Sequence, residues 1–394
     1  MFQEPAPHTT LFIWHSPEPK TSNPEGRIVF AVPAKDEEDH IAACLNAFAQ
    51  QVDAEGQPLN TSLFEVLLLV NNTTDDTIGR ALAARRHPGI HIVSVNLPPH
   101  YAHIGWARRL AMEWCSQRLV QNGHPEGIIV STDADSQLAP DFVSELTRTF
   151  AAPTVHAAGA MLLVKEEIEG TVFTNLRTYF SLEKQLRQRA QEEVAFDLVH
   201  THFSGAGFAV RQHMYAAVGG LSPLPYNEDK YFYQKLLQRD ACIKMNDRLI
   251  IYTSSRVAGR TEWGMAAQLM KWKKAEEDGE YVFVSSARAQ WLCFQLQRAL
   301  YAYWLVQNAE NLDTVCRYLT EYTLPNPLLF LNKITRPAYF GQYWYCVWEH
   351  PKLVEARQAS FLSIPLDEGI AQLDALLTTL ENHFGTPALA SLRA

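Results

Sequence analysis

One apolar segment that stops at two acidic residues constrains this chain more than any other feature. Gly127–Ser131 is short and rich in β-branched residues, as is typical of a buried strand in a parallel sheet, and Asp133 and Asp135 follow it. Residues i and i+2 of an extended segment point the same way, so both carboxylates are expected to face one point beyond the strand. In open α/β sheets, ligands bind at that edge.

The two carboxylates indicate a metal site. Two like charges so close raise the free-energy cost of ionising each other, and a bound divalent cation removes that cost. Carboxylate oxygens suit Mg²⁺ or Mn²⁺, which keep coordination positions open for the oxygens of a diphosphate. Asp133 and Asp135 are therefore the candidate metal ligands. A solvated turn after a strand is the alternative that this short motif leaves open.

Composition narrows the class of protein. The chain has 394 residues, enough for one large domain with an appendage or for two domains, and a formal net charge of −9, which argues against nucleic acid as a partner. No run approaches the roughly 20 apolar residues of a membrane-spanning helix, and the N-terminus lacks a secretion-signal pattern. The six cysteines have no Cys-x-x-Cys spacing, which favours reduced thiols. We therefore expect a cytoplasmic protein without transmembrane segments.

Strand and helix patterns alternate before the acidic segment. Buried strands are predicted at Arg27–Ala34, Phe64–Val70 and Ile90–Val95, each followed by a helical pattern, and Asp36 is the expected N-cap of the first helix. This succession predicts an α/β fold with a Rossmann-like, mostly parallel sheet flanked by helices. Neither a Gly-x-Gly-x-x-Gly nor a Gly-Lys-Ser/Thr motif is present, which argues against a dinucleotide fold or a P-loop.

The pattern changes along the chain, and three regions are predicted. Residues 1–26 form an N-terminal tail whose patch Leu11–Trp14 docks on the body or forms an edge strand. Residues 27–264 form the α/β domain, with a long helix predicted near 172–195. Residues 265–394 are mainly helical, and we interpret their aromatic stretch Pro325–Tyr345 as helical core rather than a membrane-surface patch.

Several motifs, in the correct order between Arg27 and Gly264, resemble those of the family two glycosyltransferases, which have the GT-A fold. They are Val32-Pro33-Ala34-Lys35-Asp36-Glu37-Glu38, Asn71-Asn72-Thr73-Thr74-Asp75-Asp76-Thr77, Gly105-Trp106-Ala107-Arg108-Arg109, Thr132-Asp133-Ala134-Asp135, Ser204-Gly205-Ala206-Gly207-Phe208, Gly219-Gly220 and Glu228-Asp229. The second departs from the family pattern, because Asn71 and Asn72 are amides where the family usually has an aspartate.

The resemblance implies a nucleotide-diphosphate sugar donor of the UDP or GDP type. It implies nucleotide-sugar contacts at Pro33, Ala34, Asp36, Glu38, Asn71, Asn72, Arg108, Asp133, Gly205, Ala206 and Gly207. It also implies Mn²⁺ or Mg²⁺ as the cofactor. To these residues we add Arg256 and Arg260, whose planar guanidinium groups suit a clamp on phosphate; a surface salt bridge is their alternative role.

Transfer of a sugar requires a base for the acceptor hydroxyl and a cation for the departing diphosphate. We predict an inverting glycosyltransferase of the hexosyltransferase type, with Asp229 as the general base and Glu228 orienting the acceptor; capping of the following helix is their alternative role. The sequence does not specify the hydroxyl acceptor, and it leaves a homodimer open.

Three other functions remain open at this point. The first is a retaining GT-A transferase that resembles the glucosyl-3-phosphoglycerate synthases. That resemblance implies a downstream histidine as a further metal ligand, and Tyr252–Ser255 contains no histidine. The second is a sugar-phosphate nucleotidyltransferase, although the segment after the first strand is acidic rather than glycine-rich and basic. The third is a non-catalytic nucleotide-sugar-binding module.

Overall fold

The computed structural model describes residues 12–19, 22–164, 169–192, 203–253 and 265–384. The chain divides into two compact units. Unit 1 comprises Met1–Glu166 and His200–Ser255, and unit 2 comprises Glu167–Val199 and Arg256–Ala394. The long helix α5 (Thr171–Glu192), which lies between two segments of unit 1 in the sequence, belongs to unit 2.

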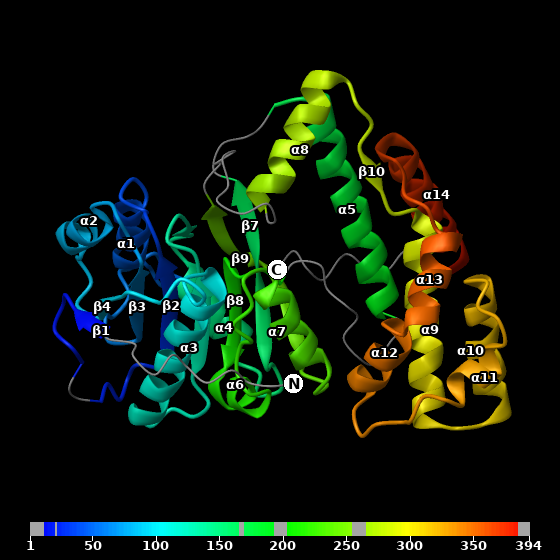
Figure 1. The fold of residues 1–394 in the computed structure, drawn as a ribbon, viewed down its shortest axis with the longest axis horizontal. Coiled ribbons are helices and arrows are strands. Elements are labelled where there is room, and N and C mark those ends of the chain that lie inside the picture. The colour runs from blue at the N-terminus through cyan, green and yellow to red at the C-terminus, as the bar shows by residue number, and fades with distance from the viewer. Residues whose placement is uncertain (1–11, 20–21, 165–168, 193–202, 254–264, 385–394) are drawn as a thin grey trace. The chain divides into compact units, whose positions relative to one another are not determined.

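Unit 1 is built on a mixed sheet (Figure 1). Its nine strands have the order β1-β4-β3-β2-β5-β8-β7-β9-β6. Its strands are β1 (Phe12–Trp14), β2 (Ile28–Ala34), β3 (Phe64–Asn71), β4 (Ile90–Val95), β5 (Ile128–Thr132), β6 (Gln137–Leu138), β7 (Ala157–Val164), β8 (Gly207–Arg211) and β9 (Ile243–Thr253). Its helices are α1 (Ile41–Ala49), α2 (Thr77–Ala84), α3 (Ile104–Gln121), α4 (Phe142–Thr149), α6 (Gln212–Ala217) and α7 (Glu228–Leu237).

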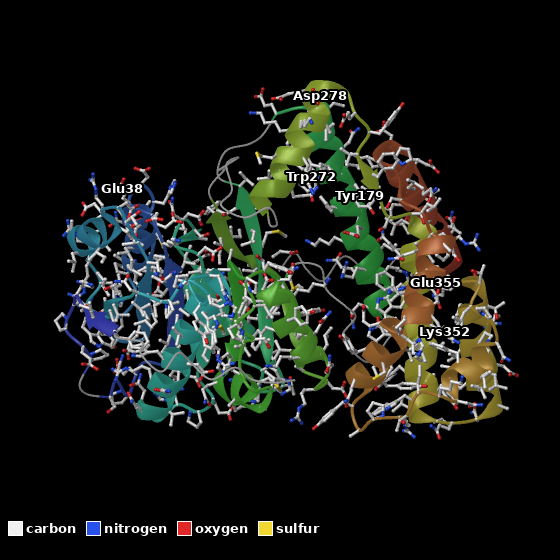
Figure 2. The ribbon with its side chains drawn as sticks, in the orientation of Figure 1. Glu38, Tyr179, Trp272, Asp278, Lys352 and Glu355 are labelled. Carbon is white, nitrogen blue, oxygen red and sulfur yellow. The ribbon has the colours of Figure 1, made fainter. Side chains whose placement is uncertain are left out.

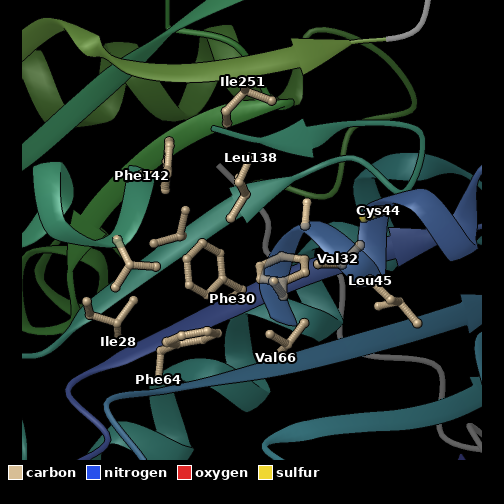
Figure 3. Close-up of a cluster of buried hydrophobic side chains, with 14 of the residues drawn as sticks. Ile28, Phe30, Val32, Cys44, Leu45, Phe64, Val66, Leu138, Phe142 and Ile251 are labelled. Atoms are coloured by element: carbon tan, nitrogen blue, oxygen red, sulfur yellow. The ribbon is translucent and has the colours of Figure 1, made fainter. Parts of the chain in front are cut away.

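Strands β2 to β5 form the parallel half of the sheet, and helices cover both of its faces. Every residue of β2 and β3 is buried, as expected for parallel strands between two helical layers. One face carries the core in Figure 3, where Phe30, Phe64 and Phe142 meet side chains of α1. The other face packs against α3. The predicted α/β fold, with a mostly parallel sheet flanked by helices, is therefore confirmed.

The remaining strands introduce antiparallel pairs. β1 pairs with β4 in the antiparallel direction, so the predicted edge strand is confirmed for Phe12–Trp14. β8 runs antiparallel between β5 and β7, with Gly207 opposite Thr132. The chain therefore enters β8 at the same edge of the sheet where β5 ends, which brings the segment before Gly207 beside the end of β5.

The first helix begins later than the sequence suggests. Asp36 was the expected N-cap, but α1 begins at Ile41 and His40 holds the N-cap position. Asp36 instead adopts a left-handed backbone with φ of 48°. Its carboxylate accepts a hydrogen bond from Thr74 N at 2.7 Å, so it ties the loop after β2 to the loop after β3.

A buried ion pair links β3 to α3 on the face opposite the Phe30 core. Glu65 accepts a hydrogen bond from Arg118 Nε at 2.8 Å, and its other carboxylate oxygen accepts one from Asn122 Nδ2 at 2.9 Å. His91 Nε2 lies 3.2 Å from the same carboxylate. Burial opposes ionisation of Glu65, but the hydrogen bonds from His91, Arg118 and Asn122 outweigh it and lower its pKa to about 2.

We predict that Glu65→Gln lowers the free energy of unfolding at pH 7 by about 3 kcal/mol, because Arg118 would remain buried without its counter-charge. The folded-state pKa of Glu65 is depressed, so its stabilisation is complete above about pH 4.5 and is lost as the pH falls towards 2. Urea unfolding across this range should show the wild-type and variant curves converging at low pH. The exposed Glu55→Gln is the control, expected within about 0.5 kcal/mol of wild type; a Glu65 effect that persists at pH 2 would contradict the assignment.

The described part of unit 2 is helical apart from a two-stranded sheet of β10 (Phe283–Val284) and β11 (Ile364–Pro365). Its other helices are α8 (Met265–Asp278), α9 (Ala287–Leu305), α10 (Ala309–Glu321), α11 (Pro327–Leu331), α12 (Phe340–Trp348), α13 (Pro351–Ser360) and α14 (Leu366–Phe384). Tyr179 and Trp272, labelled in Figure 2, lie on α5 and α8. The Tyr179 hydroxyl donates to Ser285 O at 2.8 Å and joins α5 to the start of α9.

The aromatic stretch from Pro325 to Tyr345 forms helical core, as predicted. Phe330, Tyr343 and Trp344 are buried in a cluster that also contains Leu296 of α9 and Val315 of α10. Over the part of the chain that the structure describes, no helix has both the length and the apolar character to span a bilayer.

Candidate functional site

The candidate site lies at the carboxyl edge of the parallel strands, on the face that α3 covers. Side chains alternate along a strand, so Pro33, Asn71 and Ser131 lie on the face opposite the cluster that holds Ala34, Val70 and Val130. Ser131 is followed two residues later by Asp133. The predicted residues from three separate motifs therefore meet at one edge of the sheet.

Arg108, in the second turn of α3, is the centre of the site. Its side chain is 3% exposed. Its guanidinium donates to Asp133 Oδ1 at 2.9 Å, Glu228 Oε1 at 3.0 Å, Ser131 Oγ at 2.7 Å and Gly205 O at 2.8 Å. Burial alone would lower the pKa of Arg108, but the neighbouring Asp133 and Glu228 carboxylates raise it above its ordinary value. The guanidinium is therefore a fixed positive charge among acidic groups.

The two candidate metal ligands lie in a turn rather than on an extended strand. β5 ends at Thr132, and Ser136 N donates to Asp133 O at 3.1 Å, which closes a turn with Ala134 and Asp135 at its central positions. The expected extended i, i+2 geometry was therefore wrong. The carboxylates still interact: burial raises the pKa of Asp133 above its ordinary value, Arg108 opposes this, and the charges of Asp135 and Asp229 add to the increase.

The Glu228-Asp229 pair opens α7, with Asn227 at the N-cap position. Glu228 is 5% exposed and its carboxylate binds Arg108. Asp229 is half-buried, and its Oδ2 accepts a hydrogen bond from Gly205 N at 2.7 Å. Gly205 thus contacts Asp229 through its N–H and Arg108 through its carbonyl. A side chain at residue 205 would meet the guanidinium, because an added Cβ would lie 2.8 Å from Arg108 Nη2.

A second polar cluster joins the loops after β2 and β3. Glu38, labelled in Figure 2, accepts a hydrogen bond from Asp76 N at 3.1 Å, and its own N–H donates to Asp75 Oδ2 at 3.0 Å. Thr73 Oγ1 accepts from Asp36 N at 2.9 Å. Burial works against ionisation of Asp75, but hydrogen bonds from Thr77 and the Glu38 backbone lower its pKa to about 2.

The two adjacent amides have different environments. Asn72 has φ of 49°, and its amide exchanges two hydrogen bonds with the backbone of Leu97, at 2.8 and 3.1 Å. Asn71 is 4% exposed, and its side-chain amide makes no hydrogen bond within the described residues. Of the two, Asn71 is therefore the one whose amide remains available at the edge of the sheet.

The other predicted residues have simpler placements. Ala34 ends β2 within the core, opposite Val70 of β3, and Ala206 is buried beside Gly205. Gly207 begins β8, where an added Cβ would lie 2.9 Å from Leu162 Cδ2. Arg256 and Arg260 lie outside the described residues. In the ranges that the structure describes, no group of three or more His, Cys, Asp or Glu side chains is arranged to hold a metal ion.

Comparison with known families agrees with the motifs. The model of the family described as "Glycosyl transferase family 2" matches residues 29–216, which include β2 to β8 and the Asp133 turn. The matched part of the chain belongs to glycosyl transferase family 2. The fold class predicted from the motifs, GT-A with a helical C-terminal region, is confirmed. No curated protein matches this chain in sequence.

Three solved structures resemble this chain at low sequence identity. A mannosyltransferase from Pyrobaculum calidifontis, in complex with GDP-Man and Mn²⁺, is 16% identical with a TM-score of 0.42, covering 88% of this chain and 90% of that one. S. aureus TarS 1–349, in complex with UDP-GlcNAc, is 13% identical with a TM-score of 0.43 and coverages of 89% and 92%. Glucosyl-3-phosphoglycerate synthase from Mycobacterium tuberculosis, in complex with Mn²⁺, UDP and phosphoglyceric acid, is 17% identical with a TM-score of 0.39 and coverages of 68% and 88%.

Sequence reasoning missed four contributors to this site. Ser131 binds both Arg108 and Gly205 O, and Thr73 and Asp75 organise the loop after β3. All three lie inside or next to quoted motifs, so their positions were visible, but their hydrogen bonds depend on the folded loops. The fourth omission is Gly105, whose neighbours are backbone atoms of Leu224.

We predict that Gly105→Ala destabilises unit 1 by about 2 kcal/mol, because the added Cβ would lie 2.6 Å from Leu224 N and backbone atoms cannot yield as side chains do. Thermal unfolding measures the effect. Gly79→Ala on α2 is the matched control. The three atoms nearest to its added Cβ all belong to the exposed Asp76 side chain, which can move, and alanine favours a helix, so stability should be unchanged or slightly increased. If Gly105→Ala is as stable as wild type, the backbone around Leu224 can move away from the added Cβ at no cost in stability, and the prediction is wrong.

Proposed function

We propose that unit 1 transfers a hexosyl group from a nucleotide-diphosphate sugar to an acceptor hydroxyl, with inversion at the anomeric carbon. The observation that carries this proposal is the arrangement of the acidic groups. Asp133 follows β5, whereas Glu228 and Asp229 open α7, and Arg108 and Gly205 join these two segments at the carboxyl edge of the sheet. That edge is where α/β sheets bind ligands.

The nucleoside end of the donor would lie along the ends of β2 and β3. Pro33 and the backbone of Ala34 end β2 at this edge, and the hydrogen-bonded Asp36 and Glu38 shape the loops that follow β2 and β3. Asn71 supports base recognition best, because its amide can donate and accept a hydrogen bond and has no protein partner among the described residues. Asn72 holds the loop through Leu97 and acts on the site through its backbone.

Asp133 and Asp135 are the proposed ligands of Mn²⁺ or Mg²⁺. Their oxygens are the type that these cations prefer. Burial and the charge of Asp135 both oppose ionisation of Asp133 and raise its pKa, and a bound cation would offset them. Two carboxylates leave coordination positions for diphosphate oxygens and water. When bound, the cation supplies charge stabilisation for the departing diphosphate.

Asp229 is the proposed general base. Its Oδ2 is held by Gly205 N, and the carboxylate is half-buried at the start of α7, so it can take the proton of an acceptor hydroxyl from a fixed position. Removing that proton as the hydroxyl attacks the face opposite the diphosphate gives inversion. A retaining reaction would leave the anomeric configuration unchanged, so analysis of the product anomer distinguishes the two.

We predict that Mn²⁺ increases the affinity of the protein for UDP or GDP and that the Asp135→Asn variant lacks this metal-dependent increase. Calorimetric titration of both nucleotides and their sugar conjugates, with and without Mn²⁺, measures it and identifies the base of the donor. Asp313→Asn, the same change at an exposed aspartate of α10, is the control and should bind like wild type. If neither nucleotide binds under any metal condition, the transferase proposal fails.

We predict that Asp229→Asn lowers kcat by about 10³-fold, because an amide cannot accept the hydroxyl proton, while its oxygen can still accept from Gly205 N. Nucleotide affinity should remain within about threefold of wild type, since the change removes neither Asp133 nor Asp135. Steady-state transfer and calorimetry together test this. Unchanged kcat would assign the base elsewhere, and retained nucleotide binding without turnover in the wild type would identify a non-catalytic binding module.

A further inference from the structure

The hydrogen bonds of Arg108 are almost fully committed to the protein. A guanidinium has five N–H donors. Nε donates to Glu228, Nη1 donates to Ser131 and Gly205 O, and Nη2 donates to Asp133. With a side chain that is 3% exposed, little of the group remains for contact with a bound nucleotide.

We infer that Arg108 is a positioning residue, which sets the place of Asp133 relative to Asp229, and that Glu228 is its anchor. The inference rests on the proposed function and changes two roles within it: Arg108 was expected to contact the nucleotide, and Glu228 the acceptor. One path of contacts runs from Asp133 through Arg108 to Gly205 O, and from Gly205 N to Asp229. The path joins the proposed metal ligand to the proposed base.

The position of Glu228 explains why the pair contains two acidic residues. Glu228 and Asp229 are adjacent at the start of α7, so a carboxylate bound to Arg108 fixes the backbone from which Asp229 projects. Glu228 is 5% exposed and faces the guanidinium, whereas Asp229 is half-buried. The buried member holds the helix start in place, and the more accessible member is available to the acceptor.

Unit 1 contains a second buried arginine–glutamate ion pair, Arg118 and Glu65, which lies outside the proposed site and serves as a control. Arg118, ten residues further along α3, donates through Nε to Glu65 at 2.8 Å, compared with 3.0 Å for Arg108 and Glu228. All four side chains are no more than 7% exposed. Loss of either pair should therefore destabilise unit 1, but only the Arg108 pair touches the proposed catalytic groups.

The experiment compares Arg108→Lys and Glu228→Gln with Arg118→Lys and Glu65→Gln. Lysine keeps the charge but has one ammonium in place of the planar fork, so it cannot reach all four acceptors. For each variant, kcat and the KM of donor and acceptor are measured, together with Tm and the nucleotide Kd in the presence of Mn²⁺. Because misplacement of a reacting group by about 1 Å can cost roughly 100-fold in rate, we expect kcat to fall by about 100-fold in Arg108→Lys and by at least about 10-fold in Glu228→Gln.

Nucleotide Kd and both KM values should stay within about threefold of wild type in these two variants. The Arg118 and Glu65 variants should lose Tm but keep kcat within about threefold. A tenfold weaker nucleotide Kd with unchanged kcat in Arg108→Lys would make Arg108 a nucleotide contact and overturn the inference. A raised acceptor KM with unchanged kcat in Glu228→Gln would overturn the anchor role.

An equal fall of kcat in the Arg118 pair would show a general loss of stability and would also overturn the inference. A wild-type protein that neither binds nucleotide nor transfers sugar would overturn the proposed function together with the inference. Each of the other contrary results requires an active wild type, so it overturns the inference alone.

Discussion

The site of unit 1 depends on one buried positive charge. Arg108 brings together the end of β5, the segment before β8 and the first turn of α7, and no local pattern links these three segments in the sequence. A buried guanidinium is costly unless its charge is paired and its N–H groups are bonded. That requirement is met by Asp133 and Glu228, which pair the charge, and by Ser131 and Gly205 O, which accept further hydrogen bonds. The Arg108 guanidinium therefore holds the acidic groups close to one another.

The direction of β8 is what allows this arrangement. If the chain had entered β8 from the opposite edge, Gly205 would lie at the other end of β5, far from Asp133. The antiparallel pairing, with Gly207 opposite Thr132, places the Gly205 peptide beside the end of β5. That peptide then serves two partners, because its N–H binds Asp229 and its carbonyl binds Arg108. The glycine is needed there because a side chain would meet the guanidinium.

Much of the fold was predictable, and the reasons are local. The strands that contain Phe30 and Phe64 are continuous apolar runs, and such runs are typical of strands in a parallel sheet that helices cover on both faces. The errors occur where loops bind one another. Asp36 was expected to cap α1 but binds the Thr74 loop, and Asp133 and Asp135 were expected on an extended segment but occupy a turn. In the folded chain, Asp36 binds Thr74 and Asp133 binds Arg108, and both partners are more than 20 residues away in the sequence.

The sequence by itself determined the order of strands and helices, the family of the region 29–216 and the set of acidic and amide residues at the strand ends, because hydrophobic periodicity and short motifs are properties of contiguous residues. Only the tertiary structure decided which of these residues meet. It separated Asn71, whose amide is available, from Asn72, whose amide is bound to Leu97, and it turned Glu228 towards Arg108 while Asp229 stayed accessible. The physical reason is that hydrogen bonds and ion pairs of buried groups must be satisfied across the whole fold, and adjacent residues point to different partners.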